Sequence, residues 1–183
     1  IQLGGSKVGL SCGDGLYFDK RLVEKGNRAN WASGRKVLLN RGVEAAVFES
    51  GALALASEGL PYDRCRVGVV TNLDENDLLP EYHFDDAERM YNLLRTQVDV
   101  VWPEGAAVLN AADSRVATMA ALCDGEVIFF ASDPDAPALA NAKRAVLARD
   151  GQVMLLANGE ETLLAPLSAI PLAAREWGVD NVL

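Results

Sequence analysis

The stretch from residue 44 to residue 72 constrains the fold more than any other part of this sequence. Two short apolar runs, at 45–48 and 67–70, flank a segment of small residues that favours a helix. Runs that are apolar along their whole length are typical of parallel strands covered on both faces of a sheet. We therefore predict a strand, a helix and a second strand, with the two strands as neighbours in one parallel sheet.

Each of these predicted strands ends on a polar side chain. Glu49 follows the first apolar run, and Thr71 and Asn72 follow the second. In open α/β sheets, ligands bind just beyond the carboxyl ends of the strands. We therefore expect Glu49 and Asn72 to lie side by side at the functional edge of the sheet.

The rest of the chain continues the alternation of strands and helices and then changes. A helix is expected from about Asp85 to Val101, and its Met90, Leu93 and Leu94 should face the core. Two further apolar runs, at 107–110 and 127–130, are separated by a second helix that Asp113 or Ser114 begins and that ends at Leu122. Asp150-Gly151 and Asn158-Gly159 are then typical of tight turns in hairpins. The predicted fold class is α/β: a three-layer arrangement of a mostly parallel sheet with helices on both faces, plus a small antiparallel sheet.

The length of 183 residues suits one domain with a sizeable core. We expect a single domain over 1–183, with its core at 6–135, the antiparallel part at about 145–167 and an interdomain segment at 175–183.

No apolar run is long enough to span a membrane, so no membrane partner is expected. A net charge of −9 argues against nucleic acid as a partner. Three scattered cysteines fit a reducing cytoplasm.

Several segments carry a family resemblance. They are VGLSCGDGLY at 8–17, VFES at 47–50, EGLPYDRC at 58–65, VGVVTN at 67–72, PEGAAVLNAAD at 103–113 and DNVL at 180–183. In this order and spacing they resemble the central domain of the Mur ligases, and most of all the ligase domain of cyanophycin synthetase. The resemblance covers nearly the whole chain.

The resemblance implies an ATP-dependent ligase that forms an amide bond through an acyl phosphate and adds an amino acid to a polyaspartate-like substrate. It implies Mg²⁺ held by Glu49, and contacts to ATP from Ser11, Asn72 and Asn181. It assigns no catalytic residue. The implied partners are a small-molecule or peptide substrate, the remaining domains of the parent ligase and further copies of the chain in a homo-oligomer.

The chain also departs from the family pattern. The phosphate-binding G-x-x-x-x-G-K-[ST] loop is absent from these residues, and Gly-Ala-Leu-Ala at 51–54 replaces Ala-Arg-Gly-Gly. We expect the chain to be inactive alone, and whether it is an enzyme stays open. The alternative is a catalytically degenerate Mur-ligase-like domain with a structural or assembly role. A third reading is another Mur-type ligase, for peptidoglycan or folate.

The candidate residues also have ordinary structural explanations. Glu49 could serve the start of the next helix, and Asn72 could form a turn at a strand end. Asp14 fits a tight turn with Gly15. Asp77 fits a solvated acidic loop, and His83 a surface position.

Overall fold

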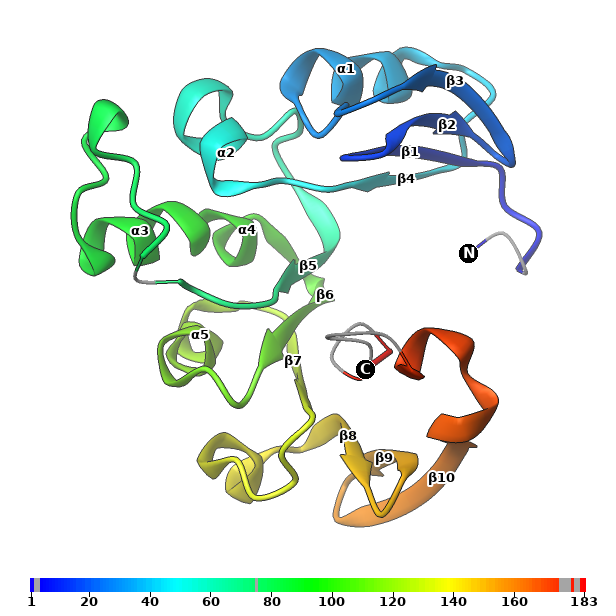
Figure 1. Cartoon of the computed structure of the whole chain (residues 1–183), viewed down its shortest axis with the longest axis vertical. Helices are drawn as coiled ribbons and strands as arrows, with labels where there is room; N and C mark the ends of the chain where they lie inside the picture. The colour runs from blue at the N-terminus through cyan, green and yellow to red at the C-terminus, as the bar shows by residue number, and fades with distance from the viewer. Residues whose placement is uncertain (2–3, 75, 175–178, 180–181) are drawn as a thin grey trace. The chain divides into compact units, whose positions relative to one another are not determined.

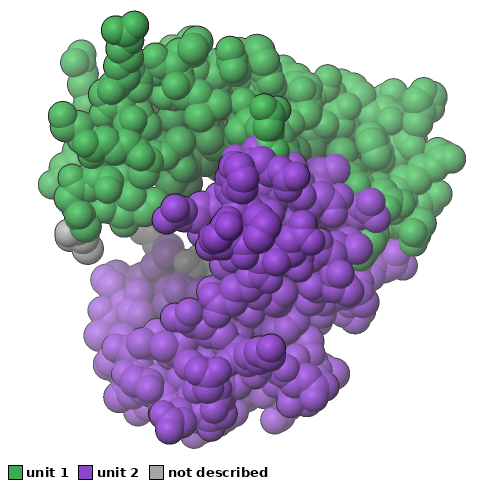
Figure 2. Space-filling view, turned by 180° about the vertical axis from the view of Figure 1, so that it is seen from behind, with its two compact units in different colours: residues 1–63, 78–93 green, residues 64–77, 94–183 purple. Residues whose placement is uncertain are grey.

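The computed structural model describes residues 1, 4–74, 76–174, 179 and 182–183 (Figure 1). The described residues form a four-stranded sheet and a six-stranded sheet. The chain divides into two compact units: unit 1 contains residues 1–63 and 78–93, and unit 2 contains residues 64–77 and 94–183 (Figure 2). Each unit is described by itself below.

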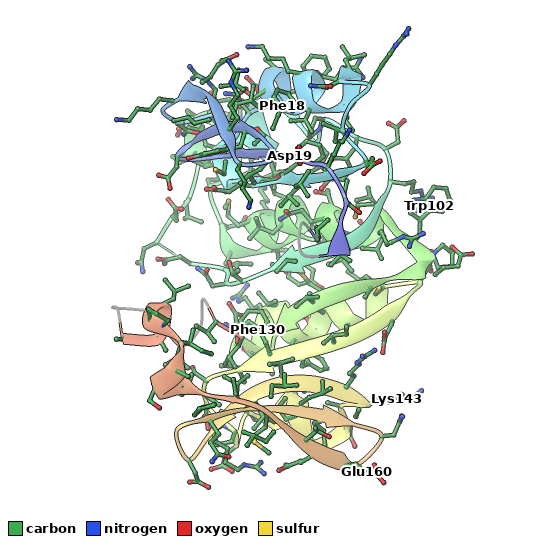
Figure 3. The ribbon with its side chains drawn as sticks, turned by 90° about the vertical axis from the view of Figure 1, so that its right-hand side faces the viewer. Phe18, Asp19, Trp102, Phe130, Lys143 and Glu160 are labelled. Atoms are coloured by element: carbon green, nitrogen blue, oxygen red, sulfur yellow. The ribbon has the colours of Figure 1, made fainter. Side chains whose placement is uncertain are left out.

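Unit 1 holds the four-stranded sheet, in the order β3-β2-β1-β4. The strands are β1 (Val8–Cys12), β2 (Gly15–Phe18), β3 (Arg21–Lys25) and β4 (Ala45–Phe48). The first three pair antiparallel, and β4 pairs parallel with β1. Asp19, labelled in Figure 3, forms the turn from β2 to β3, and its carboxylate accepts the Val8 N–H at 2.8 Å. That bond ties the turn to the start of β1.

Helix α1 (Trp31–Leu39) packs against β1 in unit 1. Asn30 begins the helix, because its side chain accepts the Ser33 N–H at 2.9 Å. Val37 of α1 is fully buried. It packs against Gly9 of β1, where a Cβ would lie only 2.4 Å from Val37 Cγ1. The unit also contains α2 (Ala52–Glu58), η2 (Pro80–Tyr82) and most of α3 (Ala87–Leu94).

Unit 2 holds the six-stranded sheet, in the order β10-β9-β8-β7-β6-β5. Strands β5 (Cys65–Val70), β6 (Val101–Asn110), β7 (Glu126–Ala131) and β8 (Arg144–Arg149) run parallel. Strands β9 (Gln152–Ala157) and β10 (Glu160–Pro166) complete the sheet antiparallel. Asp150 and Asn158 have positive φ, as the two hairpin turns require.

Helical segments of unit 2 cover one face of its parallel strands. They are α4 (Thr96–Asp99), α5 (Ser114–Thr118) and η3 (Met119–Leu122). Leu109, Val116 and Met119 are fully buried there. The short segments η4 (Pro137–Asn141), η5 (Leu167–Ala169) and η6 (Pro171–Ala174) follow later in the chain. A second apolar cluster joins Leu139 of η4 to Ala145 and Leu147 of β8.

Most of the predicted elements are confirmed, and so is the α/β fold class with a mostly parallel sheet. Met90, Leu93 and Leu94 are buried, as their helical spacing predicts. The antiparallel strands differ from the prediction in one respect: they extend the parallel sheet through the β7–β8 pairing instead of forming a sheet of their own. Within the described ranges, no helix is long and apolar enough to cross a membrane.

The prediction that β4 and β5 are neighbours in one sheet is wrong. Strand β4 pairs with β1, and β5 pairs with β6 in the other sheet. Neither strand is buried along its whole length, since Val47, Val67 and Val69 are 37%, 53% and 47% exposed. An apolar run predicts a strand that is at least partly buried, but it does not predict which other strand pairs with it.

Candidate functional site

Glu49 lies directly after β4, where two backbone contacts join it to the end of β1. Its N–H donates to the Ser11 carbonyl at 2.9 Å, and its Oε2 accepts the Gly13 N–H at 2.8 Å. The Glu49 side chain is exposed. No hydrogen bond to Oε1 is present in the described part of the chain. Glu49 therefore presents one carboxylate oxygen at the carboxyl end of a strand.

Ser11 lies one strand away and is 1% exposed. Its hydroxyl donates to the Arg28 carbonyl, and the Arg28 N–H donates to the Cys12 carbonyl at 2.9 Å. These two bonds hold the loop at residues 26–30 against β1. Since the hydroxyl proton is engaged, the Ser11 oxygen can offer only lone pairs to a further partner.

An ion-pair network supports the same loop from β3. The Glu24 carboxylate accepts from Arg28 Nε at 2.9 Å and from Lys36 Nζ of α1 at 2.5 Å. The hydrogen bond from Lys36 is the main reason that the pKa of Glu24 is lowered, and the charges of Lys36 and Arg28 add to it. The network joins β3, the loop and α1, although exposed pairs of this kind stabilise only weakly.

A small hollow lies beside these groups in unit 1. Its free volume of about 10 Å³ is close to that of one water molecule. This hollow therefore has room for a water molecule or an ion beside Glu49. The residues around it are Ser11, Ala29, Asn30, Trp31, Phe48, Glu49, Ser50, Ala54, Leu55, Gly59 and Pro61.

Asn72 lies two residues after β5, in unit 2, and is exposed. Its Oδ1 accepts the Thr71 hydroxyl at 3.0 Å. Because β4 and β5 belong to different sheets, the expectation that Glu49 and Asn72 follow neighbouring strands is wrong. Each residue nevertheless occupies the position after a parallel strand that its own local sequence predicts.

The backbone next to Asn72 is held by Asp113, which precedes α5. Oδ2 of Asp113 accepts the Leu73 N–H at 2.7 Å, and Oδ1 accepts the N–H groups of Arg115 and Val116 at 3.0 and 3.1 Å. An open hollow at the carboxyl end of β6 is lined by Leu73, Asn110, Ala112, Asp113, Ser114 and Arg115. The capping of α5 by Asp113 follows from the sequence, whereas its bond to a residue 40 positions away has no sequence signal.

The remaining candidate residues that the structure describes are exposed. Asn181 lies outside the described residues. Asp14 is exposed in the turn between β1 and β2, where its carbonyl accepts the Gly26 N–H. Asp77 is exposed, and His83 is exposed with a positive φ of 65°. Among the residues that the structure describes, no group of three or more His, Cys, Asp or Glu side chains could hold a metal.

The fold is that of a Mur ligase domain. A solved UDP-N-acetylmuramoyl-L-alanyl-D-glutamate–2,6-diaminopimelate ligase aligns with a TM-score of 0.66 and 12% identity, over 100% of this chain and 42% of that one. MurF from Acinetobacter baumannii aligns with a TM-score of 0.57 and 13% identity, over 98% of this chain and 35% of that one. At such low identity the likeness concerns the fold alone.

The sequence relatives are more specific. The chain is 36% identical over 160 residues to cyanophycin synthetase of Crocosphaera subtropica and 34% identical over 173 residues to that of Synechocystis sp.. These alignments cover 87% and 90% of this chain but only 18% and 20% of the relatives. No protein-family model matches the chain. It is a Mur-ligase-like domain related to cyanophycin synthetase, and it spans about a fifth of the length of these relatives.

Proposed function

We propose that this chain is part of an ATP-dependent amide-bond-forming ligase of the cyanophycin synthetase type. The observation that carries the proposal is the identity of 34–36% to cyanophycin synthetases, which extends over most of the chain. The solved Mur ligases share the fold at only 12–13% identity, so they give less support to a peptidoglycan ligase. The chain would act together with the remaining domains of a larger ligase and as part of a homo-oligomer.

The proposed reaction has two steps. The γ-phosphoryl group of ATP passes to a side-chain carboxylate of a polyaspartate-like substrate, which gives an acyl phosphate and ADP. The amine of an amino acid then attacks the acyl carbon, phosphate leaves, and the amine releases a proton. The substrates are therefore a peptide and a free amino acid. The free cysteines at 12, 65 and 123 suit a reducing cytoplasm.

Glu49 fits the Mg²⁺ that this chemistry uses. Mg²⁺ prefers oxygen ligands and is often bound by one or two carboxylates together with substrate phosphates and waters. An exposed carboxylate, with one oxygen outside its hydrogen bond to Gly13 and beside a hollow the size of a water molecule, agrees with that mode of binding. When bound, the ion would neutralise charge on the phosphates of ATP.

The proposed nucleotide contacts are Ser11, Asn72 and Asn181. Ser11 would reach Mg·ATP through the cation or a water bound to it, because its proton is directed to the Arg28 carbonyl and only its lone pairs are left. Asn72 is exposed at the end of a parallel strand, the usual location of ligand contacts in such sheets. The role of Asn181 rests on the family resemblance alone.

Calorimetric titration of Mg·ATP into the full-length parent protein tests this proposal, with Glu49→Ala and Glu44→Ala as the variants. The two glutamates flank β4, and each accepts one backbone N–H, from Gly13 at 2.8 Å and from Lys7 at 2.9 Å. Glu44 is therefore a matched control at the opposite end of the strand. We expect Glu49→Ala to weaken binding at least tenfold and Glu44→Ala to leave it unchanged. Equal effects of the two variants would refute the assignment of Glu49.

The alternative function is a catalytically degenerate domain that supports assembly. The observation that favours it is the sequence at 51–54, where Gly-Ala-Leu-Ala replaces a family segment that contains an arginine. The same titration separates the two functions. A folded wild-type parent that binds no Mg·ATP through this domain would support the structural role and end the enzymatic proposal.

A further inference from the structure

The geometry points to Asp113 as a positioning residue that fixes Asn72 through the backbone of Leu73. This inference rests on the proposed function of Asn72 as a nucleotide contact. Asp113 itself would touch neither nucleotide nor substrate.

The two carboxylate oxygens of Asp113 have separate tasks. Oδ1 accepts the N–H groups of Arg115 and Val116 and so begins α5. Capping a helix needs only this one oxygen. Oδ2 accepts the Leu73 N–H at 2.7 Å, across 40 positions of sequence. A bond from a neutral N–H to a carboxylate is stronger than a bond between neutral groups.

The segment after β5 is thereby fixed at two points. Val70, the last residue of β5, is 2% exposed and paired with Leu109 of β6. Leu73 is 8% exposed and held by Asp113. Only Thr71 and Asn72 lie between these points, and both are exposed. Losing the bond at Leu73 would release one end of this two-residue span, so the location of the Asn72 side chain depends on Asp113.

A serine in place of Asp113 separates the two tasks. Ser is among the best N-cap residues, so Asp113→Ser keeps a cap for α5. Its single short oxygen cannot also reach the Leu73 N–H. A merely structural role in capping predicts little effect of this substitution, whereas the positioning role predicts a local loosening at Leu73 and weaker binding.

The matched control is Asp86→Ser. Oδ1 of Asp86 accepts the Arg89 N–H at 2.8 Å at the start of α3, so this variant also replaces an aspartate cap by serine. Asp86 lies in unit 1, and within the described part of the chain its contacts are to Arg89 and Met90 of α3. We expect Asp86→Ser to change neither hydrogen exchange at Leu73 nor nucleotide affinity.

The test uses two measurements on the full-length parent protein. Amide hydrogen exchange should become at least fivefold faster at Leu73 in Asp113→Ser, with other strand amides of β5 unchanged. Calorimetry should show about five- to tenfold weaker Mg·ATP binding in Asp113→Ser. In the double variant with Asn72→Ala, the affinity should equal that of Asn72→Ala alone, because both changes act through one side chain.

Three results would overturn the inference. Unchanged exchange at Leu73 would show that Asp113 does not hold this backbone. Fully additive losses in the double variant would show that Asp113 does not act through Asn72. A wild type that binds no Mg·ATP would refute the proposed function and, with it, the role of Asn72 as a nucleotide contact. Faster exchange at Leu73 in Asp113→Ser would then establish only that Asp113 holds the Leu73 backbone.

Discussion

Gly68→Ala is predicted to destabilise unit 2 by forcing β5 away from α4. Gly68 lies within β5, and a Cβ built on it would be 2.3 Å from the backbone oxygen of Gln97 in α4. The same Cβ would be 2.9 Å from Cγ2 of Val101, a side chain that is 1% exposed. A side chain could rotate away, but a helix carbonyl cannot, so one of the two elements must shift.

The magnitude follows from two opposing terms. Adding a methyl group to a tightly packed core costs about 1–3 kcal/mol. Replacing glycine by alanine restricts the unfolded chain and returns about 0.4–1 kcal/mol where the backbone conformation is allowed. We therefore expect a net loss of about 1–2 kcal/mol. For a protein of this size, that corresponds to a decrease in Tm of about 2–8 °C.

Thermal unfolding followed by circular dichroism measures this decrease. Gly4→Ala is the control, because a Cβ at Gly4 meets no atom within 4 Å. A Gly68→Ala protein as stable as the Gly4→Ala protein would show that β5 and α4 do not approach each other as closely as described.

Three further predictions concern other parts of the chain. Leu16→Ala removes a side chain that is 1% exposed and should cost about 2–5 kcal/mol in urea denaturation; a loss below about 1 kcal/mol would contradict its burial. The pKa of Glu24 is lowered in the folded chain, so its contribution is present above the unfolded pKa and is lost as pH falls through the folded pKa. The difference in Tm between wild type and Glu24→Gln should therefore be largest near neutral pH and vanish in acid, and a constant difference would refute the ion-pair account. Burial, and secondarily Cys123, raises the pKa of the Cys65 thiol, so its maleimide labelling should rise at a higher pH than that of free cysteine.

The sequence predicts the individual elements of the fold well, because their signals are local. Asn30 caps α1 and Asp113 caps α5 through side-chain bonds that span only two or three residues. The Asp150-Gly151 turn needs positive φ at both positions, and both have it. Such features depend on neighbouring residues that can be inspected in order.

Strand neighbours and long-range contacts could not be predicted in the same way. The apolar run of β4 is compatible with any parallel partner, and its pairing with β1 depends on register over the whole strand. The bonds from Ser11 to Arg28 and from Leu73 to Asp113 join residues 17 and 40 positions apart. These contacts join segments that lie far apart in the sequence, so no periodicity or spacing reveals them.

The most direct test of the proposed ligase is the formation of the amide bond itself. The full-length parent protein would be incubated with a polyaspartate primer, Mg·ATP and single amino acids, arginine first, and the primer analysed by mass spectrometry. We expect added mass equal to the amino acid less one water per modified side chain, with one ADP and one phosphate released for each addition. An unmodified primer with every amino acid tested, from a protein that is folded and binds Mg·ATP, would contradict the account.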